Sequence, residues 1–458
     1  MGLGAIVVPL NPSESPENLR NIFFHSGARL LLHSPPLLTV AKVVVPESLL
    51  VDLNKLHQQE YTHSPLLSSA IGAINEPLAV LLYTSGTTSK PKGVLLSHEA
   101  LLLNAEALQW ALNLTPGHVH LCVLPLFHAN AWGFSMIATF LNRGHLVLCD
   151  TFPLLSFWEI VTEEKANVVS LVPTLLKALC RRGPVKPPSH LRYVVSAAAP
   201  LPVEVAKHFY SLTKLRINQG YGLSECTNFA TIMPPNIGTA LYEHLMHDYP
   251  QTCIGTPLYG TEIFVIDKQG GVLGPGERGQ LVVRGPTNML GYWSDSEKTV
   301  EAFSGGWLNT GDEGYYITEE GHKFYFITGR YKDMLIRQGE NISPVNIESQ
   351  LQELHELGDY VVVGFANVYV DEEVGLWIDS KSLLGTNIVA LRERILAATA
   401  KIPFFQRPKV VLIGETEFAK TSVGKVKRSI LVTHFARFYD WLFRPSDALL
   451  IEWLSSDS

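Results

Sequence analysis

The sequence predicts an α/β fold, in which a large N-terminal α/β domain with layered sheets is followed by a small α+β C-terminal domain. Its 458 residues, 46% of them hydrophobic, are enough for more than one domain and for a large core. Short apolar runs of strand length alternate with segments of helix length from residue 11 to residue 196. A second alternation of helix and strand patterns begins near residue 346. These observations indicate two globular units on one chain.

The composition argues against several classes of protein. Charged residues make up 17% of the chain and the formal net charge is −7, which disfavours a disordered chain and non-specific nucleic-acid binding. The five cysteines include no CxxC pair, so a reduced intracellular compartment, the cytoplasm, is expected. No stretch is apolar for the length that a membrane span needs. We therefore expect small-molecule partners, with no nucleic acid and no membrane span.

The first elements are short. Pro16–Ser26 is predicted to be a helix that ends at Gly27. Residues 30–33 and 43–45 are apolar runs that predict short strands, and residues 78–83 (LAVLLY) predict a buried strand. The alternation of strand and helix is therefore expected from the start of the chain.

The middle of the chain continues the alternation. Residues 98–112 predict a helix that stops before the turn signal Thr115-Pro116-Gly117. The other predicted elements are a strand at 121–125, a helix at 157–165, a strand at 168–172, a helix at 173–180 and a strand at 193–196.

The last third has a different pattern. Helices are predicted at residues 346–357 and 387–400, and strands at residues 360–365 and 409–413. Residues 433–458 add an aromatic-rich, amphipathic tail. The sequence leaves open whether this tail is a docking helix or a dimer contact.

Residues 82–98 (LYTSGTTSKPKGVLLSH) join two apolar segments through a loop rich in hydroxyl groups. Glycine lets the backbone approach a ligand closely, hydroxyl and N–H groups donate to oxygens, and lysine supplies positive charge. This combination suits a polyphosphate. An ordinary hydroxyl-rich surface turn is the alternative, and the Walker pattern does not fit because Lys92 precedes Gly93.

Taken as a whole, the string closely resembles the phosphate loop of the adenylate-forming (AMP-binding) superfamily. That superfamily comprises acyl-CoA synthetases, luciferases and the adenylation domains of peptide synthetases. The resemblance extends over nearly the whole chain, with further motifs in the superfamily's order. It implies that the loop holds the β- and γ-phosphates of ATP, through Thr84, Ser85, Gly86, Thr87, Thr88 and Lys92.

Residues 125–132 (PLFHANAW) place a histidine among aromatic residues. A lone histidine in such a setting is usually a packed core residue. The string resembles the superfamily's PLFH motif, however, and this resemblance assigns His128 to the acyl site. Amino-acid-activating members usually carry an aspartate here to hold the substrate ammonium, whereas this chain has Ala129, Asn130 and Ala131. We therefore disfavour α-amino acids as substrates.

The string NQGYGLSE, which ends at Glu225, is a further motif of the superfamily. Gly220 permits a tight turn, and Tyr221 offers a ring face for stacking on adenine. A lone acidic residue is usually on the surface, but in this string Glu225 is a hard oxygen ligand placed to hold Mg²⁺ against the ATP phosphates. Ser224 keeps a hydroxyl where the superfamily more often has threonine. Earlier, Ala198 stands where the superfamily more often has glycine, and its small side chain lets adenine approach the backbone.

The remaining motifs lie later in the chain. In WLNTGDEG, Asp312 is expected at the end of a strand-turn, where its two oxygens can accept both ribose hydroxyls; the alternative is a simple turn-former. By resemblance, Arg330 contacts the nucleotide, Lys332 is the hinge and Gly339 lines the pantetheine channel. Lys425, in TSVGKVKR, matches the catalytic lysine that reaches the active site from the small domain. A basic surface tail is the alternative for this last string.

The resemblance also implies the domain boundaries. We place the AMP-binding domain at residues 1–329, the small mobile domain at 330–432 and the tail at 433–458. In the superfamily the string GAIVVPLNP lies well inside the N-terminal domain, so the chain is expected to begin late and to lack elements of the first subdomain.

The implied reaction has two steps. A substrate carboxylate attacks the α-phosphorus of ATP, with Mg²⁺ and Lys425 neutralising charge, and gives acyl-AMP and pyrophosphate. The small domain then rotates about Lys332, and the thiol of CoA attacks to give acyl-CoA and AMP. The apolar residues near His128 favour a fatty or other apolar acid. Two alternatives stay open: an acyl-AMP ligase that loads the phosphopantetheine of an acyl carrier protein, and an inactive truncated relative.

Overall fold

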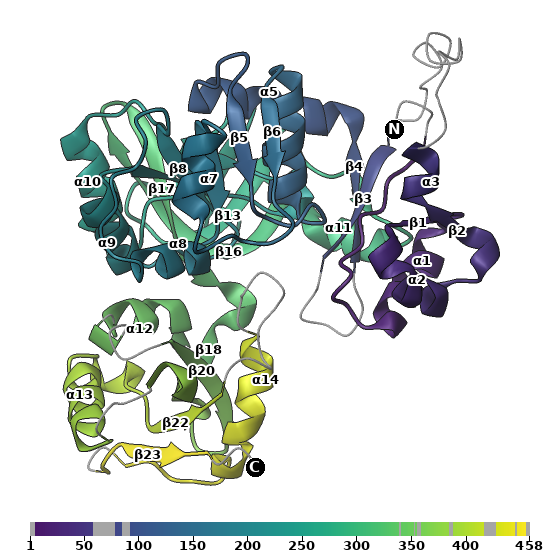
Figure 1. Cartoon of the computed structure of the whole chain (residues 1–458). Helices are drawn as coiled ribbons and strands as arrows, with labels where there is room; N and C mark the ends of the chain where they lie inside the picture. The colour runs from purple at the N-terminus through teal and green to yellow at the C-terminus, as the bar shows by residue number, and fades with distance from the viewer. Residues whose placement is uncertain are drawn as a thin grey trace.

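The chain folds into a larger body and a smaller body. The computed structural model describes residues 5–57, 78–84, 92–338, 340–351, 353–354, 359–383, 388–415, 427–444 and 447–454. Figure 1 shows the larger body above and the smaller body, in green and yellow, below. The 3₁₀ helix Tyr331–Asp333 connects β17 (His322–Arg330) of the larger body to β18 (Leu335–Arg337) of the smaller body. Helices and sheets occur in both, which confirms the predicted α/β class.

The larger body is built on a seven-stranded sheet with the order β11-β10-β9-β8-β7-β5-β6. Strands β5 to β9 are parallel, and β10 and β11 add an antiparallel edge. Every residue of β7 and β8 is buried, as expected for parallel strands covered on both faces. The bounds are β5 (Val119–Cys122), β6 (His145–Leu148), β7 (Val168–Leu171), β8 (Tyr193–Ser196), β9 (Arg216–Tyr221), β10 (Thr231–Ile232) and β11 (Thr256–Pro257).

Helices cover both faces of this sheet. On one face α7, α8, α9 and α10 form a core with the strands, to which Phe157, Leu176 and Phe209 contribute. On the other face α5 and the π-helix η3 supply Leu108 and Phe134. The helices predicted at 98–112, 157–165 and 173–180 are confirmed, within two residues at each end. The bounds are α5 (His98–Leu112), η3 (Asn130–Ala138), α6 (Thr139–Leu141), α7 (Phe157–Glu163), α8 (Pro173–Cys180), α9 (Val203–Thr213) and α10 (Thr239–His247).

Two further sheets complete the larger body. One is antiparallel with the order β12-β13-β16-β15 and has β17 paired to β16, and the other has the order β14-β4-β3. Residues of both sheets, including Val80, Val94 and Leu281, form a common core. The bounds are β3 (Leu78–Thr84), β4 (Lys92–Ser97), β12 (Glu262–Ile266), β13 (Gly279–Arg284), β14 (Gly291–Tyr292), α11 (Ser296–Ala302), β15 (Phe303–Ser304) and β16 (Trp307–Glu319).

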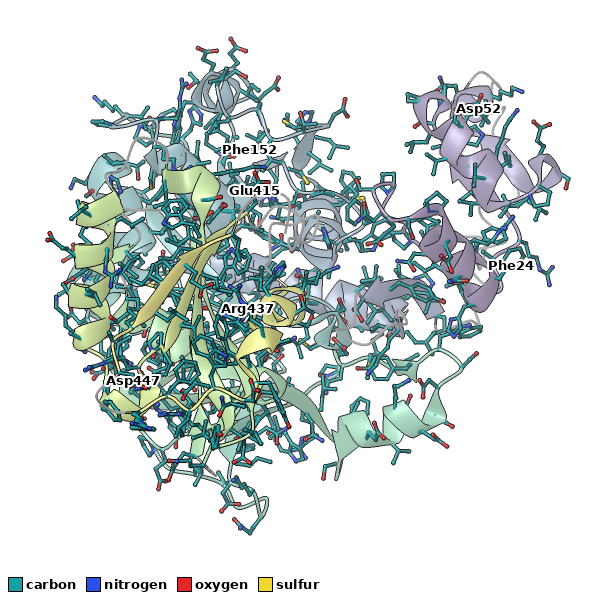
Figure 2. The ribbon with its side chains drawn as sticks, turned by 90° about the horizontal axis from the view of Figure 1, so that it is seen from below. Phe24, Asp52, Phe152, Glu415, Arg437 and Asp447 are labelled. Atoms are coloured by element: carbon teal, nitrogen blue, oxygen red, sulfur yellow. The ribbon has the colours of Figure 1, made fainter. Side chains whose placement is uncertain are left out.

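A small unit at the start of the chain lies to one side of the larger body; Figure 2 labels Phe24 and Asp52 in it. The helix predicted at Pro16–Ser26 is confirmed as α1, because Ser15 caps its first turn and Gly27 ends it with φ 69°. The other elements are β1 (Leu31–His33), α2 (Leu38–Val44), β2 (Leu50–Asp52) and α3 (Leu53–His57).

The strand predicted at residues 43–45 is wrong, because the chain forms α2 there and then ends the helix at Val44. Valine favours strands on its own. In the helix, however, Ala41 and Val44 are three residues apart and therefore lie on the same face, where both are buried. Val44 packs against Leu19 and Phe23 of α1, so tertiary contact decided the local structure.

The smaller body has a six-stranded sheet with the order β19-β18-β21-β22-β23 and with β20 paired to β21. Helices α12 and α13 cover one face, and α14 and the 3₁₀ helix Thr433–Phe438 cover the other. Phe435 and Phe438 are buried in this second core, and β23 pairs with β22. The bounds are β19 (Glu340–Ile342), α12 (Pro344–Gln350), β20 (Tyr360–Asn367), β21 (Asp371–Asp379), α13 (Ile388–Ala400), β22 (Val410–Gly414), α14 (Arg428–Val432) and β23 (Leu450–Trp453).

The helix expected to begin at residue 346 begins two residues earlier because Ser343 caps it. The helix ends at Gln350, before the predicted end at residue 357, which itself lies outside the described residues. In the described part of the chain, no helix has the length and apolar character that a membrane span requires.

Candidate active site

A cavity of about 560 Å³ lies where the two bodies meet, and residues of both line it. Five residues predicted to bind the nucleotide are among them. The larger body contributes Ala198, Gly220, Tyr221, Asp312 and Arg330. The structure therefore brings together, in one concave site, residues that are up to 132 positions apart in the sequence.

The sheet positions the first of these residues. Ala198 follows the end of β8, and Gly220 lies at the end of the adjacent parallel strand β9, so both fall at the carboxyl edge of the sheet. Ligands bind at this edge in open parallel sheets. Ala198 has φ 72°, a left-handed conformation that explains why glycine is common there. A Cβ atom at Gly220 would lie 2.2 Å from the ring of Phe229, so this position has no room for a side chain.

Asp312 is the centre of a polar cluster in the cavity. Its Oδ2 accepts a hydrogen bond from the Tyr221 hydroxyl, and its Oδ1 accepts one from Arg330 Nε; both donor–acceptor distances are 2.6 Å. Asp312 is only 3% exposed. Contrary to the strand-turn prediction, it lies inside the long strand β16, paired with Arg330 of β17. The charges of Asp312 and Arg330 are therefore brought together by the antiparallel register of β16 and β17 and not by a turn.

Burial and nearby charge shift the pKa values of Tyr221 and Arg330, the two partners of the Asp312 carboxylate. Burial, followed by the nearby charge of Asp312, raises the pKa of Tyr221 well above its usual value, so the phenol remains a hydrogen-bond donor. Burial, the largest single effect, lowers the pKa of Arg330, but the charge and hydrogen bond of Asp312, together with the nearby Tyr221 and Asp333, outweigh it and the pKa is raised. Both groups therefore donate to Asp312 at all physiological pH values. The Tyr221 side chain was predicted only to offer its ring face, and the hydroxyl contact was missed.

Glu225 lies on the 3₁₀ helix Ser224–Cys226, on the stretch that follows β9. Its Oε1 accepts a hydrogen bond from the Tyr292 hydroxyl over 2.9 Å, and its backbone oxygen accepts one from Met289 N over 2.7 Å. Lys92 Nζ lies 4.9 Å from the centre of the Tyr292 ring. Ser224 stands next to Glu225 on the same helix, so the predicted phosphate and metal residues approach one another around Tyr292, which sequence reasoning had not singled out.

The predicted phosphate loop lies largely outside the described residues. Thr84 is the last residue of β3 and Lys92 the first of β4, and the two pair across the antiparallel strands. The predicted loop therefore joins the two strands at this end. Ser85, Gly86, Thr87, Thr88, Gly339 and Lys425 also lie outside the described residues, and of Lys332 only the backbone is described, in the 3₁₀ helix between the two bodies.

His128 lies apart from the cavity lining, just before η3. Its ring packs against Phe127, with ring centres 4.5 Å apart. Burial lowers the pKa of His128 to about 4, so the ring is neutral at physiological pH. Its Nε2 has no hydrogen-bond partner among the residues that the structure describes. A neutral imidazole with an unused nitrogen is thus held beside the η3 helix.

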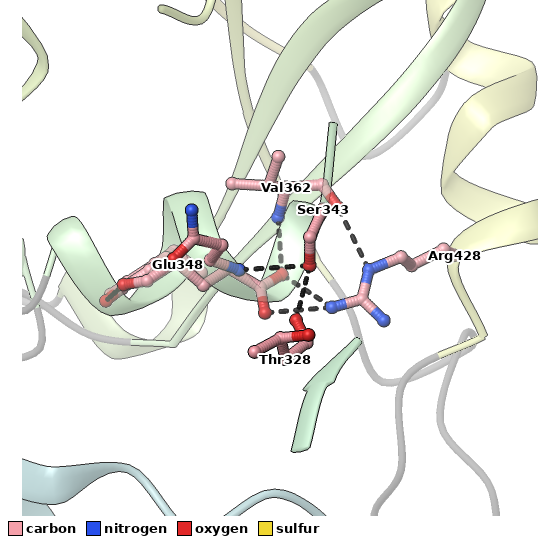
Figure 3. Close-up of polar contacts among 7 residues, drawn as sticks. Thr328, Ser343, Glu348, Val362 and Arg428 are labelled. Carbon is pink, nitrogen blue, oxygen red and sulfur yellow. Dashed lines mark hydrogen bonds and ion pairs between the residues drawn. The ribbon is translucent and has the colours of Figure 1, made fainter. Parts of the chain in front are cut away.

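The smaller body contributes a second polar cluster to the cavity, which the sequence did not reveal (Figure 3). Arg428 donates to both carboxylate oxygens of Glu348, over 2.7 and 2.8 Å, and to the backbone oxygen of Val362 over 3.0 Å. Val362 N in turn donates to Glu348 Oε1 over 2.8 Å. Ser343, which caps α12, donates to the backbone oxygen of Thr328 in β17 over 2.6 Å. The only sequence signal for this cluster was the basic string around Lys427.

Comparisons with known proteins agree with this arrangement. A sequence profile of the family described as "AMP-binding enzyme" matches residues 1–293. A feruloyl-CoA synthase from Amycolatopsis sp. is 31% identical over 351 residues, covering 76% of this chain and 68% of that protein. A sulfoacetate–CoA ligase from Cupriavidus necator is 29% identical over 443 residues, covering 95% of this chain and 84% of that protein.

Solved structures share the fold. An amide bond synthetase from Marinactinospora thermotolerans superposes with a TM-score of 0.80 at 25% identity, covering 95% of this chain and 86% of that one. The superposition includes both bodies, since its coverage extends over nearly the whole chain. The family profile and the relatives therefore confirm the superfamily that the motifs predicted: the chain belongs to the AMP-binding enzyme family.

Proposed function

We propose that the protein is an acid–thiol ligase: it activates a carboxylic acid with ATP to acyl-AMP and then transfers the acyl group to the thiol of CoA. The observation that carries the proposal is the cavity between the two bodies, where Asp312, Tyr221 and Arg330 form one hydrogen-bonded cluster. The relatives named above are CoA ligases and synthases, which favours CoA as the acceptor.

The residues at the cavity fit a nucleotide. Ala198 and Gly220 present nearly bare backbone, which suits a flat base. Gln219 also lines the cavity, and its Oε1 has no hydrogen-bond partner within the described part of the chain. Asp312 already accepts two hydrogen bonds, but each carboxylate oxygen has a second lone pair, so ribose hydroxyls can be added to the cluster. Arg330 adds positive charge for a phosphate.

Glu225 is the candidate ligand for Mg²⁺. In the described residues no group of three His, Cys, Asp or Glu side chains is arranged to hold a metal ion. A single carboxylate fits Mg²⁺, because Mg²⁺ in proteins is usually coordinated by one or two carboxylates together with phosphate oxygens and water. When bound, Mg²⁺ would neutralise part of the charge on the phosphates.

The chemistry needs no base from the protein. A carboxylic acid has a pKa near ~4, so it is ionised at neutral pH and can attack the α-phosphorus directly. The protein's part is positioning and charge neutralisation. Thr84, Lys92 and the loop between them hold the leaving phosphates, and Lys425 bridges the carboxylate and the α-phosphate. The small domain then rotates about Lys332. This rotation moves Lys425 away and lets the thiol of CoA approach through a channel lined by Gly339.

The acid is proposed to be apolar, a fatty or an aromatic one. One support is the string PLFHANAW, in which His128 and Trp132 stand among apolar residues and no carboxylate is present to hold a substrate ammonium. The other is the similarity to a feruloyl-CoA synthase. A neutral His128 is compatible with such an acyl group, because a charged imidazolium beside an apolar chain would be costly.

Acid-dependent release of AMP and pyrophosphate tests the proposal. The panel should contain medium- and long-chain fatty acids, cinnamic-type aromatic acids and a short charged acid such as sulfoacetate, each with CoA. We expect acyl-CoA formation with at least one apolar acid, at a kcat/KM at least about tenfold above that for the charged acid, since a charge in an apolar pocket is disfavoured. No AMP from any acid would refute the activity, and a preference for sulfoacetate would refute the substrate class.

A further inference from the structure

Tyr292 connects two residues assigned to phosphate and metal binding. Its hydroxyl donates to Glu225 Oε1 over 2.9 Å, while its ring face meets the Lys92 ammonium, 4.9 Å from the ring centre. A cation over a tyrosine ring is attracted by the ring quadrupole. One side chain therefore contacts both the carboxylate that would hold Mg²⁺ and the lysine at the end of the phosphate loop, although the three residues come from separate elements.

The backbone around Tyr292 is itself fixed. Tyr292 pairs with Val94 between β14 and β4, and its N–H donates to Thr299 Oγ1 over 2.9 Å. On the other side, Met289 N holds the backbone oxygen of Glu225 over 2.7 Å. The main chains of both partners are thus anchored, and the flexible part that remains is the Glu225 side chain with its three torsions. The Tyr292 hydroxyl restrains those torsions.

We propose that Tyr292 is a positioning residue that holds the Glu225 carboxylate in place for the divalent cation of the metal–nucleotide complex and keeps Lys92 on its ring face. The inference rests on the proposed use of ATP and goes beyond it in naming how the cation ligand is oriented. By donating to one oxygen, the hydroxyl leaves the other side of the carboxylate for the ion. Partners that orient a metal ligand typically change metal affinity or activity 10- to 100-fold.

The test uses Tyr292→Phe, which keeps the ring and removes only the hydroxyl. Binding of Mn²⁺ to the full chain in the presence of ATP, followed by electron paramagnetic resonance, gives a readout independent of turnover. We expect the Mn²⁺ affinity to fall about tenfold, at the low end of that range because the Glu225 backbone stays anchored. Tyr292→Leu, which also removes the ring beneath Lys92, should weaken Mn²⁺ binding further.

Tyr325→Phe is the matched control. Its hydroxyl donates to the backbone oxygen of Ile263 over 2.8 Å, so this variant loses one tyrosine hydrogen bond in the same body without touching Glu225. Its Mn²⁺ affinity should stay within about twofold of the wild type. A double variant, Glu225→Gln with Tyr292→Phe, should bind Mn²⁺ no more weakly than Glu225→Gln alone, because the hydroxyl acts only through that carboxylate.

Three outcomes would overturn the inference: unchanged Mn²⁺ affinity in Tyr292→Phe, an equal loss in Tyr325→Phe, or a double variant whose losses add. A wild-type chain that binds ATP without taking up Mn²⁺ would overturn it as well. The proposed reaction can fail separately. If no acid supports AMP release but Tyr292→Phe still weakens Mn²⁺–ATP binding selectively, the positioning role stands and the ligase proposal falls.

Discussion

Replacing Arg428 by alanine should destabilise the smaller body, because the guanidinium joins three of its elements. It donates twice to Glu348 on α12 and once to the backbone of Val362 in β20, while Arg428 itself begins α14 (Figure 3). The side chains of Arg428 and Glu348 are only 22% and 21% exposed. Removal therefore leaves the partly buried Glu348 carboxylate uncompensated, with only the Val362 N–H still donating to it, and removes one donor from the Val362 backbone oxygen.

The expected magnitude follows from that burial. Removing one partner of a fully buried ion pair costs about 3–5 kcal/mol, because the other charge is left uncompensated. Here about one fifth of each side chain is exposed, so solvent relieves part of the penalty and we expect about 2–4 kcal/mol. Arg437→Ala is the matched control: its pair with Glu452 lies on the same body, but the side chains are 49% and 33% exposed. Such a pair contributes about 0–1 kcal/mol.

Native-state amide exchange followed by mass spectrometry suits this measurement, because peptides from β20 and β21 report on the smaller body by itself. A double-mutant cycle with Glu348→Ala should give a coupling free energy of at least about 1.5 kcal/mol, since the two side chains share two hydrogen bonds. The reasoning is refuted if Arg428→Ala costs no more than Arg437→Ala, or if the two single losses add within about 0.5 kcal/mol.

Three other changes have defined outcomes. Asp312→Asn should raise the KM for ATP about 10- to 100-fold, because a charged acceptor of two hydrogen bonds is lost; steady-state kinetics with an unchanged KM would contradict this. Gly220→Ala should cost about 1–3 kcal/mol in thermal unfolding, since its Cβ would lie 2.2 Å from the Phe229 ring, whereas Gly238→Ala, with nothing within 4 Å, should stay within about 0.5 kcal/mol. Burial lowers the pKa of His120 from 6.5 to about 3, so between these pH values the unfolded chain binds a proton that the folded chain does not. The free energy of unfolding should therefore fall by about 3 kcal/mol from pH 6.5 to pH 4. A His120→Gln variant whose stability falls equally steeply with pH would disprove this.

The sequence alone determined the family, because its motifs are contiguous strings whose identity does not depend on how the chain folds. It also determined helices whose ends are set locally. The helix Pro16–Ser26 is bounded by the Ser15 cap and by Gly27, and α5 ends at a residue in the left-handed conformation, Asn113. Such signals act within a few residues and can be read without the tertiary structure.

The sequence named five of the residues that line the cavity, but it did not name their contacts. Asp312 was expected in a turn and lies inside β16, where antiparallel register places it opposite Arg330. Residues 43–45 were expected to form a strand, but helix α2 ends there at Val44, which packs on α1. In both cases a partner distant in the sequence outweighed the local preference.

Only the tertiary structure showed that Tyr292 meets Glu225 and that Arg428 meets Glu348, pairs that are 67 and 80 residues apart. A tyrosine in a GYW string or an arginine in a basic string has no local feature that names its partner. The partner is set by how β14 lies against β4 and how α12 packs beside β20. Sequence determined which chemical groups are present, and the packing of sheets and helices decided which of them touch, because hydrogen bonds and ion pairs act over a few ångströms of space and not over positions in the chain.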